Sequence, residues 1–350
     1  MRNIRIFVPV VLGLMVCSLL LGCGSATSSG GGGTSDVSIY FASMNPASIT
    51  ALLSTYSNGG GKQIIRNFTS MYTLEAVTLA PNRSVIIAQF SQSNKHYLGL
   101  MTTSGGSVGY DIWPDPVGSI PALNASFGIN SDLTCITGDA NSYFLTYASN
   151  EASVLALCPV SWESHPCLSK SSSYDAFNRF NEIWVKEVAT SNPATNITNS
   201  TTFESHPAFS PIDEKKIAFI CQDGSNYYVA KKDDYSSGSI VKISNDHSFV
   251  DSPLIWSEDG AFLYYIANTG ASTALYKTEV SSGTETQVLA SSGAGIYTDL
   301  KKLPGSSRLF YVLFPSTGTG EIWSVDPTTG ATLEIYNDEN HNFFDYSHYT

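Results

Sequence analysis

The chain has 350 residues and a formal net charge of −12. Charged residues make up only 14%, whereas Tyr (19), Phe (17) and Gly (28) are abundant, a composition typical of many short strands joined by polar turns. A chain this acidic repels phosphate backbones and has no Lys/Arg cluster, so we expect no nucleic-acid partner.

The first element is a leader. Arg2 and Arg5 precede an apolar run from Ile6 to Gly22, which at 17 residues is short for a membrane span and typical of a signal-peptide core. The run ends in Leu20-Leu21-Gly22-Cys23, which resembles a bacterial lipobox. We therefore predict a signal peptide over residues 1–22, a lipidated Cys23 and a flexible tether over residues 23–36. An ordinary secretory signal followed by a chance cysteine is the alternative.

Four cysteines remain after Cys17 and Cys23: Cys135, Cys158, Cys167 and Cys221. In an exported protein an even remainder suggests disulfides. Cys158 and Cys167 bracket "PVSWESHP", where a bridge would restrain a loose hairpin, so we predict that pair. Cys135 and Cys221 lie in apolar runs, and we expect buried thiols there. The spacings offer no C-x-x-C pair for zinc.

The clearest repeat starts at Glu204. From there the sequence predicts four short strands in about 40 residues, which is the content of one propeller blade. The pattern returns twice downstream, with Pro207, Pro253 and Leu300 in register at intervals of 46 and 47 residues. Fainter copies upstream place Val77 and Leu133 in the same register.

These repeats predict an all-β protein, a six-bladed β-propeller of four-stranded antiparallel sheets. The tetrapeptide "ESHP" occurs at residues 163–166 and 204–207. We expect the second copy to head a blade and the first to lie in an inserted loop, because the stretch from Ser171 to Phe180 lacks a convincing second strand. Seven blades is the alternative. The expected blades span residues 37–70 with 345–350, 71–118, 119–202, 203–247, 248–292 and 293–344.

The two ends of the chain predict how the ring closes. Residues 37–70 read as second, third and fourth strands without a first strand. At the other end "YSHYT" aligns with "ESHPA", which places His348 in register with His206. We therefore expect the C-terminal strand to complete the first blade and remove its open edge.

The stretches "HPAFSPIDEKKIAF" and "SPLIWSEDGAFLYYI" resemble the repeat of TolB-like β-propellers, a WD-type fold, whose blades open with a Pro-x-Phe-Ser-Pro-Asp-Gly-type turn. Ile212 and Asp213 depart from that turn, whereas Glu258-Asp259-Gly260 keeps it. The resemblance is strongest over residues 204–290 and implies fold more than function, because such propellers occur as periplasmic interaction proteins, peptidase domains and lyases.

Two catalytic signals are weak. The segment Gly105–Gly109 fits G-x-S-x-G, but a hydrolase elbow needs a following helix, and here a Gly-rich turn between two strands is predicted. Lyases of this fold use a metal and several histidines, and only His206 and His348 occupy matching blade positions.

A non-covalent site is the alternative, because residues just before the first strands crowd around the mouth of the central channel. Their acidic character would favour a cation, a basic peptide or a Lys/Arg-bearing partner. The candidate residues are Glu75, Asp132, His206, Asp251, Asp299 and His348. The acidic stretch Asn337–Asn342 lacks calcium-ligand spacing and is expected to be a solvated loop.

We therefore predict a lipid-anchored platform that binds a protein or peptide partner in the cell envelope and has no chemistry of its own. Gly24 after Cys23 implies the outer membrane in a bacterium with two membranes. No cofactor is expected, although calcium or another divalent cation at the channel mouth is left open. The alternative function is a metal-dependent lyase or hydrolase that uses the channel mouth.

Overall fold

The computed structural model describes strands joined by turns and loops. The described residues are 20–22, 38–44, 50–68, 73–79, 85–92, 95–102, 107–113, 126–127, 134–138, 142–148, 151–158, 163–171, 173–187, 190, 192–248, 250, 252–268, 272–290, 295–302, 306–315 and 320–337. Within them, no helix is long and apolar enough to cross a membrane.

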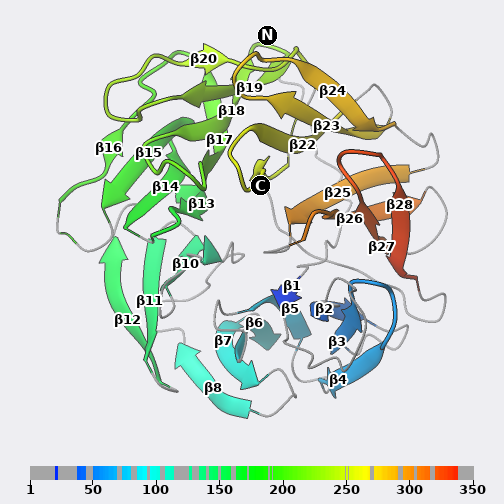
Figure 1. Cartoon of the computed structure of the whole chain (residues 1–350). Coiled ribbons are helices and arrows are strands. Elements are labelled where there is room, and N and C mark those ends of the chain that lie inside the picture. The colour runs from blue at the N-terminus through cyan, green and yellow to red at the C-terminus, as the bar shows by residue number, and fades with distance from the viewer. Residues whose placement is uncertain are drawn as a thin grey trace, which may run out of the picture.

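These residues form seven four-stranded antiparallel sheets arranged around a common centre (Figure 1). Each sheet consists of four strands consecutive in sequence, as expected for propeller blades. The fold is therefore an all-β propeller, as the sequence predicts.

Blades one to three lie in the N-terminal part of the chain. Their strands are β1 (Leu20–Gly22), β2 (Ser38–Met44), β3 (Thr50–Tyr56) and β4 (Gln63–Asn67); β5 (Thr73–Leu79), β6 (Val85–Gln92), β7 (Lys95–Thr102) and β8 (Ser107–Trp113); and β9 (Ser126–Phe127), β10 (Thr134–Gly138), β11 (Ser142–Ala148) and β12 (Glu151–Cys158).

Blades four to seven complete the ring. Their strands are β13 (Glu163–Leu168), β14 (Tyr174–Arg179), β15 (Glu182–Glu187) and β16 (Thr195–Asn196); β17 (Phe203–Phe209), β18 (Ile217–Asp223), β19 (Asn226–Lys232) and β20 (Val241–Lys242); β21 (Ile255–Trp256), β22 (Phe262–Asn268), β23 (Thr273–Glu279) and β24 (Glu285–Leu289); and β25 (Gly295–Lys302), β26 (Leu309–Pro315), β27 (Glu321–Val325) and β28 (Thr332–Tyr336).

The expected count of six blades is wrong, and the seven-bladed alternative agrees with the structure. The predicted blade over residues 119–202 divides into two sheets, β9 to β12 and β13 to β16. The missed second strand is β14, whose sequence YDAFNR carries three polar or charged residues. Two of its apolar residues, Ala176 and Phe177, are fully buried. The polar residues of the strand hid it from a hydrophobicity pattern.

In blade five the middle strand β18 contains much of the core. In β18 the first five residues, Ile217 to Cys221, are all buried, because this strand is covered on both faces by neighbouring blades. The outermost strand β20 is exposed at both of its residues. Burial therefore falls from the middle of a blade toward its rim, and adjacent blades share their apolar contacts.

The ring closes by contact between blade seven and blade one. Ile39 and Phe41 of β2 share one buried cluster with Phe310 and Tyr336. The rings of Phe41 and Tyr336 meet edge to face at 4.7 Å, and Lys62 Nζ donates to Asn337 O at 2.8 Å.

The innermost strand of blade one differs from the expectation. β1, from the end of the predicted leader, pairs with β2 through Leu20↔Tyr40 and Gly22↔Ser38. This strand takes the place expected for the C-terminal strand, and residues 345–350 lie outside the described residues. Residues 1–22 were expected to be a cleaved leader, so no strand was predicted there.

Candidate functional site

The innermost strands of several blades contain the same β-bulge. In β17 the pairing with β18 shifts between Ser205 and Ala208, so that His206 and Pro207 face one residue of the partner strand. The same shift occurs in β13 between Ser164 and Cys167. Both copies of "ESHP" therefore occupy equivalent inner strands. The expectation that the first copy lies in an inserted loop is wrong, and the tetrapeptide repeats because the fold repeats.

The bulge also recurs in β25, between Thr298 and Lys301. It places Asp299 where β17 has His206. The two residues share a left-handed backbone, with φ of 51° at His206 and 50° at Asp299. Residues other than glycine adopt this region at a cost, and Asp and His are among those that tolerate it best. Two blades thus hold a His and an Asp in one unusual conformation, the register that the sequence predicts.

Both side chains are buried. His206 is 6% exposed and Asp299 is 8% exposed. His206 Nδ1 lies 3.1 Å from Ser205 Oγ, and Asp299 Oδ1 lies 3.3 Å from Lys301 Nζ. These residues were expected at an open channel mouth, and the structure places them in the inner layer of the propeller.

The remaining predicted site residues are only partly described. Glu75 lies in β5 at a comparable shift in pairing, between Leu74 and Ala76. The residues Cys23, Asp132, Asp251 and His348 lie outside the described residues. Within the described part of the chain, no group of three or more His, Cys, Asp and Glu side chains could hold a metal ion.

The Cys158–Cys167 disulfide that the sequence predicts is not formed in this structure, because Cys167 has a free thiol. Cys158 ends the outermost strand of blade three, whereas Cys167 lies in the innermost strand of blade four. Burial raises the pKa of the Cys167 thiol to about 11 and that of Cys221 to about 12. Cys221 is a fully buried free thiol, as predicted.

The G-x-S-x-G segment joins two strands of one blade, as predicted. β7 ends at Thr102, and β8 begins at Ser107 and pairs with it antiparallel. The sequence therefore continues into a strand where a hydrolase nucleophile elbow requires a helix.

The second residue of β17, Glu204, is a buried carboxylate that was not predicted as a site residue. Glu204 is 1% exposed and accepts hydrogen bonds from the hydroxyls of Ser200 and Thr202 in the preceding loop. Its backbone N–H donates to Asn181 O at 2.8 Å, which ties β17 to the β14–β15 turn of blade four. The sequence feature that could have identified Glu204 is the Glu of the repeated tetrapeptide "ESHP".

This junction exposes two aromatic side chains. Phe180, in the β14–β15 turn, is 60% exposed, and Phe203, at the start of β17, is 54% exposed. The backbone hydrogen bond between Glu204 and Asn181 joins the two residues that follow them. Asp223 is also exposed at this end, beside the Phe203↔Gln222 pair. We call Phe180, Phe203 and Asp223 the junction surface.

The turn that presents Phe180 is strained. Phe180 and Asn181 have φ of 53° and 65°, the geometry of a two-residue hairpin turn that favours Asn and Gly at both positions. A bulky aromatic residue there is an outlier. The Arg179 guanidinium lies 5.2 Å from the Phe180 ring and 4.9 Å from Trp184, which holds the turn in place. An exposed phenylalanine kept in a strained turn is a functional signal.

No protein-family model matches the sequence. No curated protein matches it either.

Solved structures share the fold at low identity. TolB from Acinetobacter baumannii is 13% identical with a TM-score of 0.54; the match covers 87% of this chain and 64% of that one. A puromycin-hydrolyzing peptidase of Mycobacterium tuberculosis is 12% identical with a TM-score of 0.64, over 91% of this chain and 52% of that one.

An oligogalacturonate lyase in complex with manganese is 11% identical with a TM-score of 0.56, over 84% of this chain and 82% of that one. The chain thus spans about two thirds of the TolB chain and about half of the peptidase. At such identities the likeness shows the fold alone. The likeness confirms the β-propeller fold that the resemblance to TolB-like repeats implies.

Proposed function

We propose that this chain is a lipid-anchored binding platform of the cell envelope, without chemistry of its own, that holds a protein partner on its junction surface. The leader and Cys23 support the anchor and the export. The fold supports binding, because a ring of blades presents rigid loops and turns at each end.

The observation that carries this proposal is the exposure of Phe180 and Phe203 at one junction. Exposed aromatic side chains on a rigid turn resemble the anchors of protein interfaces, where Phe, Trp, Tyr and Arg are enriched. The hydrogen bond from Glu204 N–H to Asn181 O holds together the two backbone segments that carry these side chains. A partner would therefore meet a preorganised surface with little ordering cost.

The charge of the chain defines the chemistry of the partner. The net charge is −12, and Asp223 is exposed beside Phe203. A segment with an apolar anchor flanked by Lys or Arg would complement both features, and the acidic field would speed its approach.

Capture of the partner by the full chain in its native envelope tests this proposal. We expect Phe180→Ser with Phe203→Ser to abolish capture, because both anchors are lost. Ile212→Ser is the matched control, since Ile212 is 64% exposed in the β17–β18 turn at the other end of the same strand. Capture that survives the double variant, or is lost equally in the control, would refute the junction surface.

The anchor has its own test. Cys23→Ser should move the chain from the detergent phase to the aqueous phase, because no lipid would be attached. Unchanged partitioning would refute lipidation and leave the junction surface unaffected.

A metal-dependent lyase or hydrolase is the second candidate. It is favoured by one observation: His206 and Asp299, both metal-ligating types, occupy the same bulge position on inner strands. Metal retained after dialysis and lost in His206→Ala would support it over the platform.

A further inference from the structure

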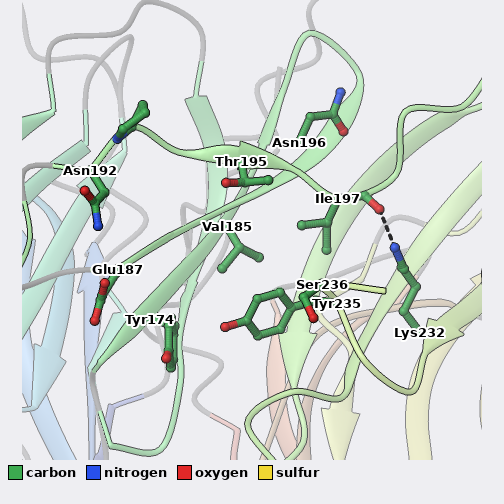
Figure 2. Close-up of a pocket in the computed structure, with 11 residues that line it drawn as sticks. Tyr174, Val185, Glu187, Asn192, Thr195, Asn196, Ile197, Lys232, Tyr235 and Ser236 are labelled. Carbon is green, nitrogen blue, oxygen red and sulfur yellow. Dashed lines mark hydrogen bonds between the residues drawn. The ribbon is translucent and has the colours of Figure 1, made fainter. Parts of the chain in front are cut away.

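Blades four and five line a half-open cavity of about 320 Å³ where they pack together (Figure 2). Blade four contributes Tyr174 of β14, Glu187 of β15 and Thr195 of β16. Blade five contributes Lys232, the last residue of β19, and Tyr235 in the following loop. The volume is at the lower end of the range for small-molecule sites.

A buried lysine forms one wall of this cavity. Lys232 is 8% exposed, and its Nζ donates to Ile197 O of blade four at 2.7 Å. Burial lowers its pKa, partly offset by the charge of Asp234, whose carboxylate accepts from Ser236. Among the ion pairs of the described residues none involves Lys232.

An ammonium group in this position suits a carboxylate. It has three N–H donors, and the bond to Ile197 O uses one of them. The folded chain already bears the cost of removing this group from water. A ligand carboxylate would therefore gain a charge-assisted hydrogen bond without that cost on the protein side.

Two tyrosines lie between the walls. The rings of Tyr174 and Tyr235 lie 5.7 Å apart at a tilt of 58°. Burial raises the pKa of Tyr235, so its hydroxyl is neutral. The pair offers ring surface for an aliphatic body and hydroxyls that can bond to ligand oxygens.

The far wall carries the opposite charge. Glu187 is exposed, and Figure 2 shows it across the cavity from Lys232, with Asn192 above it. A carboxylate here would repel a second negative charge and accept hydrogen bonds from hydroxyl groups. The two walls therefore select a ligand with one anionic end and one hydroxylated end.

We propose that this cavity, which we call the seam pocket, binds a small hydroxylated monocarboxylate, with its carboxylate at Lys232 and its hydroxyls toward Glu187. This binding is separate from the protein partner of the junction surface, so either proposal stands without the other.

Isothermal titration of the full chain with D-gluconate and with sorbitol tests the pocket. The two probes are six-carbon polyols that differ in the carboxylate. We expect gluconate to bind saturably and at least tenfold more tightly than sorbitol. Equal affinities would overturn the proposal, as would no binding of gluconate.

Variants locate the binding. Lys232→Met keeps the length of the side chain and should weaken gluconate binding at least tenfold. Lys242→Met, on the exposed strand β20, is the matched control and should bind as the unchanged chain. Should Lys232→Met fail to fold, Thr195→Trp fills the pocket from an exposed rim position and should block gluconate equally. Unchanged gluconate affinity in folded Lys232→Met or in folded Thr195→Trp would contradict the proposal.

Discussion

Two successive contacts between blades contain charged residues of opposite sign. The seam between blades four and five holds Lys232, and the seam between blades five and six holds Glu285. Lys232 and Thr278 lie 46 residues apart, the interval between Pro207 and Pro253, so they are equivalent positions.

The second seam is occupied by protein groups. Glu285 accepts from the Tyr265 hydroxyl, from His247 Nε2 at 3.1 Å and from Asn245 Nδ2 at 3.0 Å. The side chains of His247 and Glu285 are 7% and 5% exposed. His247 and Asn245 belong to blade five, so one carboxylate joins two blades. If the seam pocket binds its proposed ligand, one repeat serves to hold two blades together at one seam and to bind a ligand at the next.

The largest expected effect is the loss of this buried carboxylate. Glu285→Leu would leave Tyr265, His247 and Asn245 without their shared acceptor. Breaking a buried charged network typically costs about 3–5 kcal/mol of unfolding free energy. Chemical denaturation should show this loss, whereas Glu334→Leu, at an exposed site on β28, should stay within about 0.5 kcal/mol.

The acid dependence of stability should follow the same residue. Hydrogen bonds from His247, Tyr265 and Asn245 outweigh desolvation and lower the Glu285 pKa to about 2. Its stabilising contribution is therefore full above its ordinary pKa of 4.5 and is lost as pH falls from there toward 2. The free energy of unfolding should fall less between pH 6 and pH 3 in Glu285→Gln than in the unchanged chain. An equal fall in both proteins would exclude Glu285 as the cause.

Lys232→Met should affect stability far less. It removes a hydrogen bond to Ile197 O but also an ammonium whose burial is unfavourable. These effects oppose each other, so the free energy of unfolding should change by about 1 kcal/mol or less. A loss as large as that of Glu285→Leu would mean that both seams depend on their charge for adhesion.

Truncation should show which strand completes blade one. In the full chain β1 pairs with β2, so deleting residues 344–350 should change the melting temperature little. A chain that begins at Cys23 lacks β1. If "YSHYT" then pairs with β2 in its place, deleting residues 344–350 from this chain should lower its melting temperature by several degrees. Equal melting temperatures with and without residues 344–350 would exclude the C-terminal strand from this role.

The repeats were readable because their spacing and turns are local. Pro207, Pro253 and Leu300 predicted the inner strands, and the bulges at His206 and Asp299 confirm that register. The strand β14 was missed because Asp175 and Asn178 interrupt its apolar pattern.

The sites were harder to predict from sequence. Phe180 is not a turn-forming residue type, so its left-handed conformation gave no signal. Tyr174, Glu187 and Lys232 come together only when two blades pack, and no spacing within one blade predicts that contact. The junction surface and the seam pocket both depend on packing between residues that are distant in sequence.

Amide hydrogen exchange of the full chain with and without D-gluconate tests the difference between the seams most directly. We predict added protection in residues 182–197 and 226–236, which border the seam pocket, and none in residues 273–289 at the Glu285 seam. Protection spread equally over both seams, or absent from the first, would contradict the assignment of one seam to binding and the other to adhesion.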